Sequence, residues 1–83
     1  MTASKTEVLA LRLSPALLAA LRTAAERRGC NASEMARHII GGELERARNL
    51  AGLERVDART LMAAIDGDER ARAICRAAVG YKP

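Results

Sequence analysis

The stretch T-E-V-L-A-L-R-L, residues 6–13, alternates its side chains with a period of two and is followed directly by Ser14-Pro15. This alternation predicts a β-strand, and the residue before a proline disfavours helix. An interrupted first turn of a helix is the alternative interpretation. The three leucines share one face of the expected strand and three other residues share the opposite face: Leu9, Leu11 and Leu13 against Val8, Ala10 and Arg12.

A single strand cannot satisfy its own backbone hydrogen-bonding groups, so this one needs a partner strand from another chain. The length of 83 residues points the same way, because small chains bury too little surface to be stable without a staple or a second subunit. Cys30 and Cys75 lie far apart and form no CxxC pattern, which argues against a disulfide framework or a zinc site. We therefore expect a homodimer.

The rest of the chain has helical spacing. Ser14-Pro15 is a strong helix start, and Gly29 is a suitable end for the helix that follows. A second helix begins after a cap at Asn31 or Ser33. Gly41-Gly42 either ends that helix near residue 40 or lies within a helix that continues to about residue 50, and we favour continuation.

Two further helical segments are expected in the second half of the chain. Asp57 can cap the first of them, Asp66-Gly67-Asp68 separates it from the second, and Gly80 is a plausible stop. The apolar spacing of the two segments predicts that the following residues face a core: Leu61, Met62, Ala64, Ile65, Ala71, Ile74, Cys75 and Ala78.

The composition suits an anionic partner. The net charge is +4 and the sequence pI is about 9.8. Residues 1–42 carry a net charge of +3 (six basic and three acidic side chains) and residues 43–83 carry +1 (eight basic and seven acidic). No apolar run approaches the roughly 18 residues of a membrane span, so we expect a cytoplasmic protein without membrane contact.

The sequence offers little for catalysis or for a cofactor. His38 is the one histidine, and no nucleophile lies near it in the sequence, so it is expected to face solvent or phosphate. Asp66-Gly67-Asp68-Glu69 resembles the start of a calcium loop but lacks the later acidic ligands. We expect no enzyme activity, no metal and no cofactor.

Residues 8–35, V-L-A-L-R-L-S-P-A-L-L-A-A-L-R-T-A-A-E-R-R-G-C-N-A-S-E-M, resemble the ribbon-helix-helix family, to which the Arc and MetJ repressors belong. The match covers about residues 6–48. The resemblance implies a mainly α, intertwined homodimer with an antiparallel two-stranded β-ribbon between the subunits. Residues 1–48 would be the DNA-binding and dimerisation domain, and residues 49–83 a helical C-terminal extension.

The resemblance also implies site residues. Val8, Ala10 and Arg12 would enter the major groove, and Arg12 would read a base. Five further residues would hold phosphates, two from the N-terminal arm and three from the start of the second helix: Lys5, Thr6, Asn31, Ala32 and Ser33. Leu9, Leu11 and Leu13 would form the dimer core. Val8 and Ala10 depart from the family pattern, because they cannot hydrogen-bond to bases.

The function expected from this resemblance is sequence-specific binding of double-stranded DNA by a homodimer, as a transcriptional repressor. Assembly of several dimers along DNA is compatible with it. An antitoxin whose C-terminal helices bind a toxin, and an accessory protein of plasmid mobilisation or partition, would use the same fold. A helical protein-interaction module with no nucleic-acid role is the alternative from another class. A protein partner would meet residues 49–83.

Overall fold

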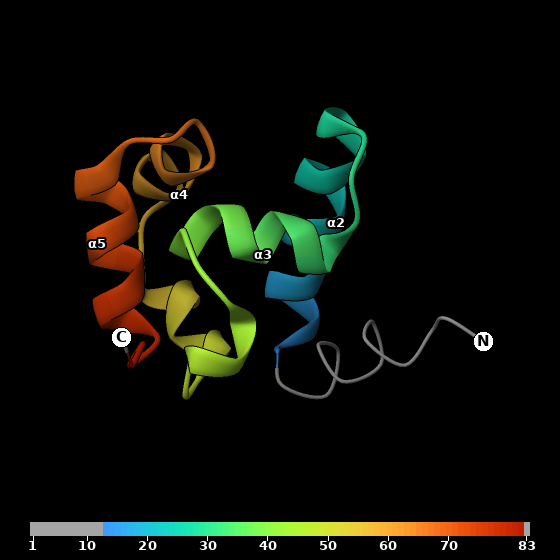
Figure 1. Cartoon of the computed structure of the whole chain (residues 1–83). Coiled ribbons are helices and arrows are strands. Elements are labelled where there is room, and N and C mark those ends of the chain that lie inside the picture. Colours follow the sequence, from blue (N-terminus) through green and yellow to red (C-terminus); the bar gives the residue numbers. More distant parts are fainter. Residues whose placement is uncertain (1–12, 83) are drawn as a thin grey trace.

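One short helix, α3 (Ala32–Ile40), lies at the centre of the fold in the computed structural model, which describes residues 13–82 (Figure 1). Helix α2 (Pro15–Arg28) packs on one side of it, and helices α4 (Ala58–Ile65) and α5 (Glu69–Ala78) pack on the other. Two 3₁₀ segments, η1 (Leu44–Arg46) and η2 (Leu50–Arg55), connect α3 to α4.

Local capping sets the ends of α2 and α3. The Ser14 hydroxyl accepts a hydrogen bond from the Leu17 amide, Pro15 takes the first helical position, and Gly29 ends the helix with φ +71°. Asn31 caps α3, which ends at Gly41 with φ +65°. The predicted first helix, its Ser-Pro start and its glycine end are confirmed.

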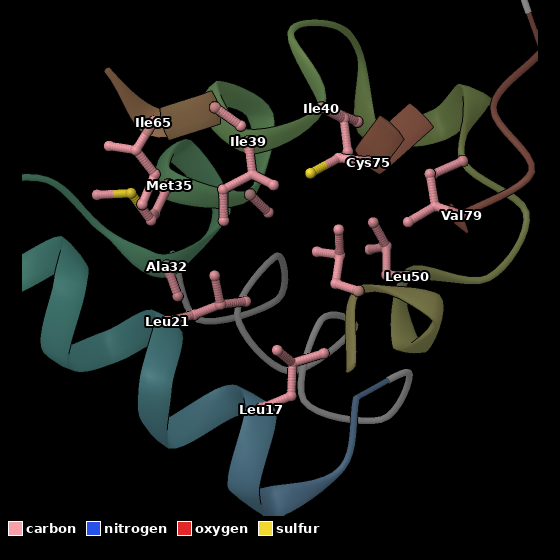
Figure 2. Packing of buried hydrophobic residues seen from close by; sticks show 14 of the residues in the cluster. Leu17, Leu21, Ala32, Met35, Ile39, Ile40, Leu50, Ile65, Cys75 and Val79 are labelled. Atoms are coloured by element: carbon pink, nitrogen blue, oxygen red, sulfur yellow. The ribbon is translucent and has the colours of Figure 1, made fainter. Parts of the chain in front are cut away.

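The core surrounds α3. Six of the nine residues of α3 are buried, and Met35, Ile39 and Ile40 are at most 1% exposed. In Figure 2, Leu17 and Leu21 of α2 extend toward this helix, while Ile65, Cys75 and Val79 reach the same cluster from the C-terminal half of the chain. The buried residues form a wide apolar face on α3, and a face of this width needs cover from more than one neighbouring element. Here the same chain supplies that cover.

The ribbon-helix-helix prediction is therefore wrong. Residues 13–82 form helices and turns and contain no strand, and residues 49–82 are part of the core around α3 where a separate helical extension was expected. The intertwined arrangement that depends on this ribbon is wrong as well, whereas the homodimer stays a prediction. Residues 6–12 of the expected strand lie outside the described residues, whereas Leu13, assigned to a dimer core, is buried in the core of its own chain.

The second helix does not continue to residue 50. Gly41 adopts a left-handed conformation, and its amide donates to the Arg37 carbonyl, which closes α3. Gly42 lies against Tyr81: a Cβ at Gly42 would come within 2.1 Å of the Tyr81 hydroxyl oxygen. The glycine pair thus ends the helix and lets the C-terminal segment approach it closely.

Two of the predicted core residues are at the surface. Met62 on α4 is 47% exposed and Ile74 on α5 is 49% exposed, although both follow the apolar spacing of their helices. Each helix is covered along a narrower stripe than its sequence suggested. Buried on these helices are Ala64, Ile65, Ala71 and Cys75.

The cap of α4 should make stability depend on acid in a defined way. The Thr60 amide donates to Asp57 Oδ1 (2.7 Å), and this bond lowers the pKa of Asp57 below its ordinary value. A pKa depressed by folding adds stability at pH above the unfolded value of about 3.9, and that stability is lost as the pH falls through the lower folded value.

We expect Asp57→Asn to keep the cap but to remove this dependence, because the amide oxygen still accepts the bond and does not titrate. The melting temperature of the wild type should fall more steeply than that of the variant below pH of about 4. Circular dichroism melts over a series of pH values measure both curves. Parallel curves would contradict the assignment.

Candidate nucleic-acid interface

The structure describes only part of the DNA-contacting set expected from the sequence. Five of those residues lie outside the described residues: Lys5, Thr6, Val8, Ala10 and Arg12. Leu9 and Leu11 of the expected dimer core lie outside them as well. The three that are described, Asn31, Ala32 and Ser33, occupy the N-terminal cap and first turn of α3.

Glu34 already occupies the N-terminus of α3. The Glu34 amide donates to Asn31 Oδ1 (2.8 Å), and the Asn31 amide donates to Glu34 Oε1 (3.3 Å), so the two residues form a capping box. A phosphate at this end would meet the Glu34 carboxylate. Ala32 and Ser33 are also 7% and 8% exposed, which leaves little of either residue at the surface. The geometry does not favour the phosphate role expected for these three residues.

A different set of cations is brought together by the C-terminal segment. The Arg48 and Asn49 amides both donate to the Val79 carbonyl (2.9 and 3.0 Å), and the Lys82 amide donates to the Arg46 carbonyl (2.8 Å). Residues 46–49 and 79–82 therefore run side by side, although 30 or more residues separate them in the sequence. Exposed cations result on both segments, and we call them the basic patch: Arg46, Arg48 and Lys82.

Packing on the inner side fixes the direction of these side chains. Ala47, which follows η1, is 6% exposed and faces the core, whereas Arg46 and Arg48 on either side of it are exposed. The aliphatic part of Arg48 lies beside Gly80, where an added Cβ would meet its carbons at 3.5–3.7 Å. The Tyr81 hydroxyl turns inward and accepts a hydrogen bond from the Glu43 amide (3.2 Å).

Two other arginines near this region are used within the fold. Arg76 Nη1 donates to the Ile40 carbonyl (3.0 Å) and Arg72 Nε donates to the Ala64 carbonyl (2.9 Å). They satisfy carbonyls at the C-terminal ends of α3 and α4 and complement the negative ends of those helix dipoles. By contrast, the ion pairs found among residues 13–82 involve none of the basic patch.

Other polar residues of the described chain give no sign of a reaction centre. His38 is exposed on α3. Cys75 is buried, and burial raises the pKa of its thiol, with a partial offset from the charge of Arg76. Residues 13–82 contain no cluster of three or more His, Cys, Asp or Glu side chains placed to hold a metal ion. Within the same range, no helix is long and apolar enough to cross a membrane.

The basic patch was missed at the level of sequence. Its one local signal is the R-A-R pattern at residues 46–48, in which a small apolar residue stands between two cations. In a helix that continues to residue 50, as we expect from the sequence, residues 46–48 would not form a separate segment. The contribution of Lys82 has no local signal, because it depends on pairing between distant segments.

Comparison with known protein families, curated proteins and solved structures gave no match to this chain.

Proposed function

We propose that the protein binds double-stranded DNA through the basic patch, Arg46, Arg48 and Lys82. The observation that carries this proposal is the pairing of residues 46–49 with residues 79–82, which brings three exposed cations onto two neighbouring segments. Contacts from Arg and Lys to phosphates supply most of the affinity in non-specific DNA binding. The overall charge of +4 acts in the same direction.

Arginine dominates the cations of this protein, with 12 of the 14 basic residues. Its planar guanidinium donates two parallel hydrogen bonds to a phosphate and stays charged at every physiological pH. In the basic patch, the aliphatic carbons of Arg48 lie beside Gly80, which has no side chain.

The scarcity of aromatic residues favours a duplex over a single strand. Proteins that bind single-stranded nucleic acid stack its bases on exposed aromatic rings. Tyr81 is the one aromatic residue of this chain, and its hydroxyl is engaged with the Glu43 amide next to Gly42. Binding to the phosphates of a duplex needs no ring.

The role proposed for this binding is regulation of transcription.

The test is titration of a fluorescein-labelled DNA duplex, read by anisotropy, between about 50 and 200 mM salt. We expect the logarithm of affinity to fall linearly with the logarithm of salt, by about 0.9 for each phosphate contact. The variant Arg46→Gln/Arg48→Gln/Lys82→Gln should bind more weakly and with a smaller slope.

The matched control is Arg22→Gln/Arg55→Gln/Arg70→Gln. It removes the same charge from three exposed positions outside the basic patch, on α2, η2 and α5. We expect its salt slope to stay close to that of the wild type. Equal losses in both variants would mean that diffuse charge binds the DNA, and affinity that ignores salt would contradict the proposal altogether.

A further inference from the structure

An open apolar groove lies between α2 and α4, away from the basic patch. One wall is Ala20, Thr23 and Ala24 of α2, and the other is Met62 of α4. Arg27 and Arg28 line its end, and its volume is about 350 Å³. Figure 1 shows these two helices on opposite sides of α3, without close packing between them.

An apolar side chain that lines the groove is exposed to solvent. Met62 is 47% exposed, and it belongs to the apolar side of an α4 sequence that otherwise points to the core. Methionine is flexible and polarisable, so it adapts to varied partner surfaces. The small residues at positions 20, 23 and 24 leave the α2 wall shallow, which allows the backbone of a partner to approach it.

The charged side chains at the groove leave an excess of positive charge. Arg28 pairs with Asp66 of α4, and this ion pair ties the two walls together at one end. Arg27 is exposed beside it and is in neither of the ion pairs found among the described residues. Arg59 is exposed one helical turn before Met62, on the same face of α4. Each wall of the groove thus has an exposed arginine on its helix, Arg27 on α2 and Arg59 on α4.

We propose that this groove binds an acidic amphipathic helix of a partner protein. The apolar face of that helix would cover Met62 and the alanines of α2, and its carboxylates would meet Arg27 and Arg59. Recognition of a helix in a groove uses this division between an apolar floor and charged edges. Charge complementarity selects an acidic partner over a basic one and fixes its orientation.

A fluorescein-labelled synthetic helix tests the proposal. It carries leucines at every third and fourth position and glutamates on the flanks, and a second peptide has lysine at each glutamate position. Anisotropy with the full chain should show binding of the acidic peptide alone. Met62→Gln should weaken that binding about tenfold or more, and Arg27→Glu should weaken it for the acidic peptide while improving it for the basic one.

Ile74→Gln is the matched control, because Ile74 is the other large exposed apolar residue of the described chain and lies on α5, outside the groove. Its binding should equal that of the wild type. Equal loss in Ile74→Gln, equal affinity for both peptides, or no binding of either would overturn the proposal.

Two other occupants are tested alongside the acidic peptide. If a DNA duplex displaces the acidic peptide from the wild type, and Met62→Gln abolishes binding of that duplex, the groove binds nucleic acid and the proposal is overturned. If the wild type self-associates in analytical sedimentation and Met62→Gln does not, the groove binds a second copy of this chain and the proposal is overturned. The groove and the basic patch share no residue, so failure at one leaves the other standing.

Discussion

A chain that ends after Arg48 is expected to be unfolded. The residues that follow supply much of the cover of α3: Leu50, Leu53, Ala64, Ile65, Ala71, Cys75 and Val79. Without them, Met35, Ile39 and Ile40 would meet water, at a cost of about 1.5–3 kcal/mol for each fully buried side chain. Their sum is comparable to the whole stability expected for a chain of this size, about 4–12 kcal/mol.

The loss is aggravated at the end of α3. Arg76 would no longer donate to the Ile40 carbonyl, and the Val79 carbonyl would no longer accept from Arg48. We expect the fragment 1–48 to show little helical signal in circular dichroism and no cooperative melt. Mixing it with the fragment 49–83 should restore both, because the two parts form one core.

A cooperative melt of the fragment 1–48 alone would contradict this expectation. It would mean that the first 48 residues complete a core without the rest of the chain. Restoration by the second fragment is the more informative control, since it separates the loss of specific packing from an unrelated failure such as aggregation.

Gly52→Ala is expected to cause the largest loss of any single methyl addition in the described chain. A Cβ at Gly52 would lie 2.0 Å from the Ala78 carbonyl oxygen and 2.8 Å from its carbon. Both are backbone atoms at the end of α5, so no side chain can rotate away, and η2 must separate from α5. Overpacking of this kind costs about 1–3 kcal/mol and more where the backbone resists.

The backbone conformation of Gly52 does not itself require glycine, since its φ is not among the positive values. Gly29→Ala is the matched control. There φ is +71° but nothing lies within 4 Å of an added Cβ, so the cost is the strain of the left-handed conformation, about 1–2 kcal/mol. Urea denaturation of both variants and the wild type compares them.

We expect the urea midpoint of Gly52→Ala to fall well below that of Gly29→Ala. An order reversed between the two would mean that conformational strain outweighs steric overlap in this fold. A near wild-type midpoint for Gly52→Ala would show that η2 and α5 are less closely packed than the structure describes.

These expectations share one feature, the dependence of the first half of the chain on the second. The resemblance assigns residues 49–83 to an extension, whereas residues 49–82 form a wall of the core and one side of the basic patch in the structure. Met62 gives the C-terminal half a part in the groove as well. Core, proposed DNA contact and proposed partner site are thus each built from both halves.

The sequence by itself determined the helix ends that depend on local hydrogen bonds. Ser14, Asn31 and Asp57 each accept a bond from an amide three residues ahead, and Gly29 closes the first helix. A cap and its helix lie within one turn of each other, so the residue types alone specify them.

Only the tertiary structure decided what covers α3. The apolar α3 sequence was compatible with cover from a second subunit or from its own chain, and the alternating stretch at the N-terminus favoured the wrong choice. The same holds for Met62, Ile74 and the basic patch. Their exposure depends on contacts between segments tens of residues apart. Such contacts leave no periodic pattern in the sequence, because the residue pattern of one segment does not depend on which other segment packs against it.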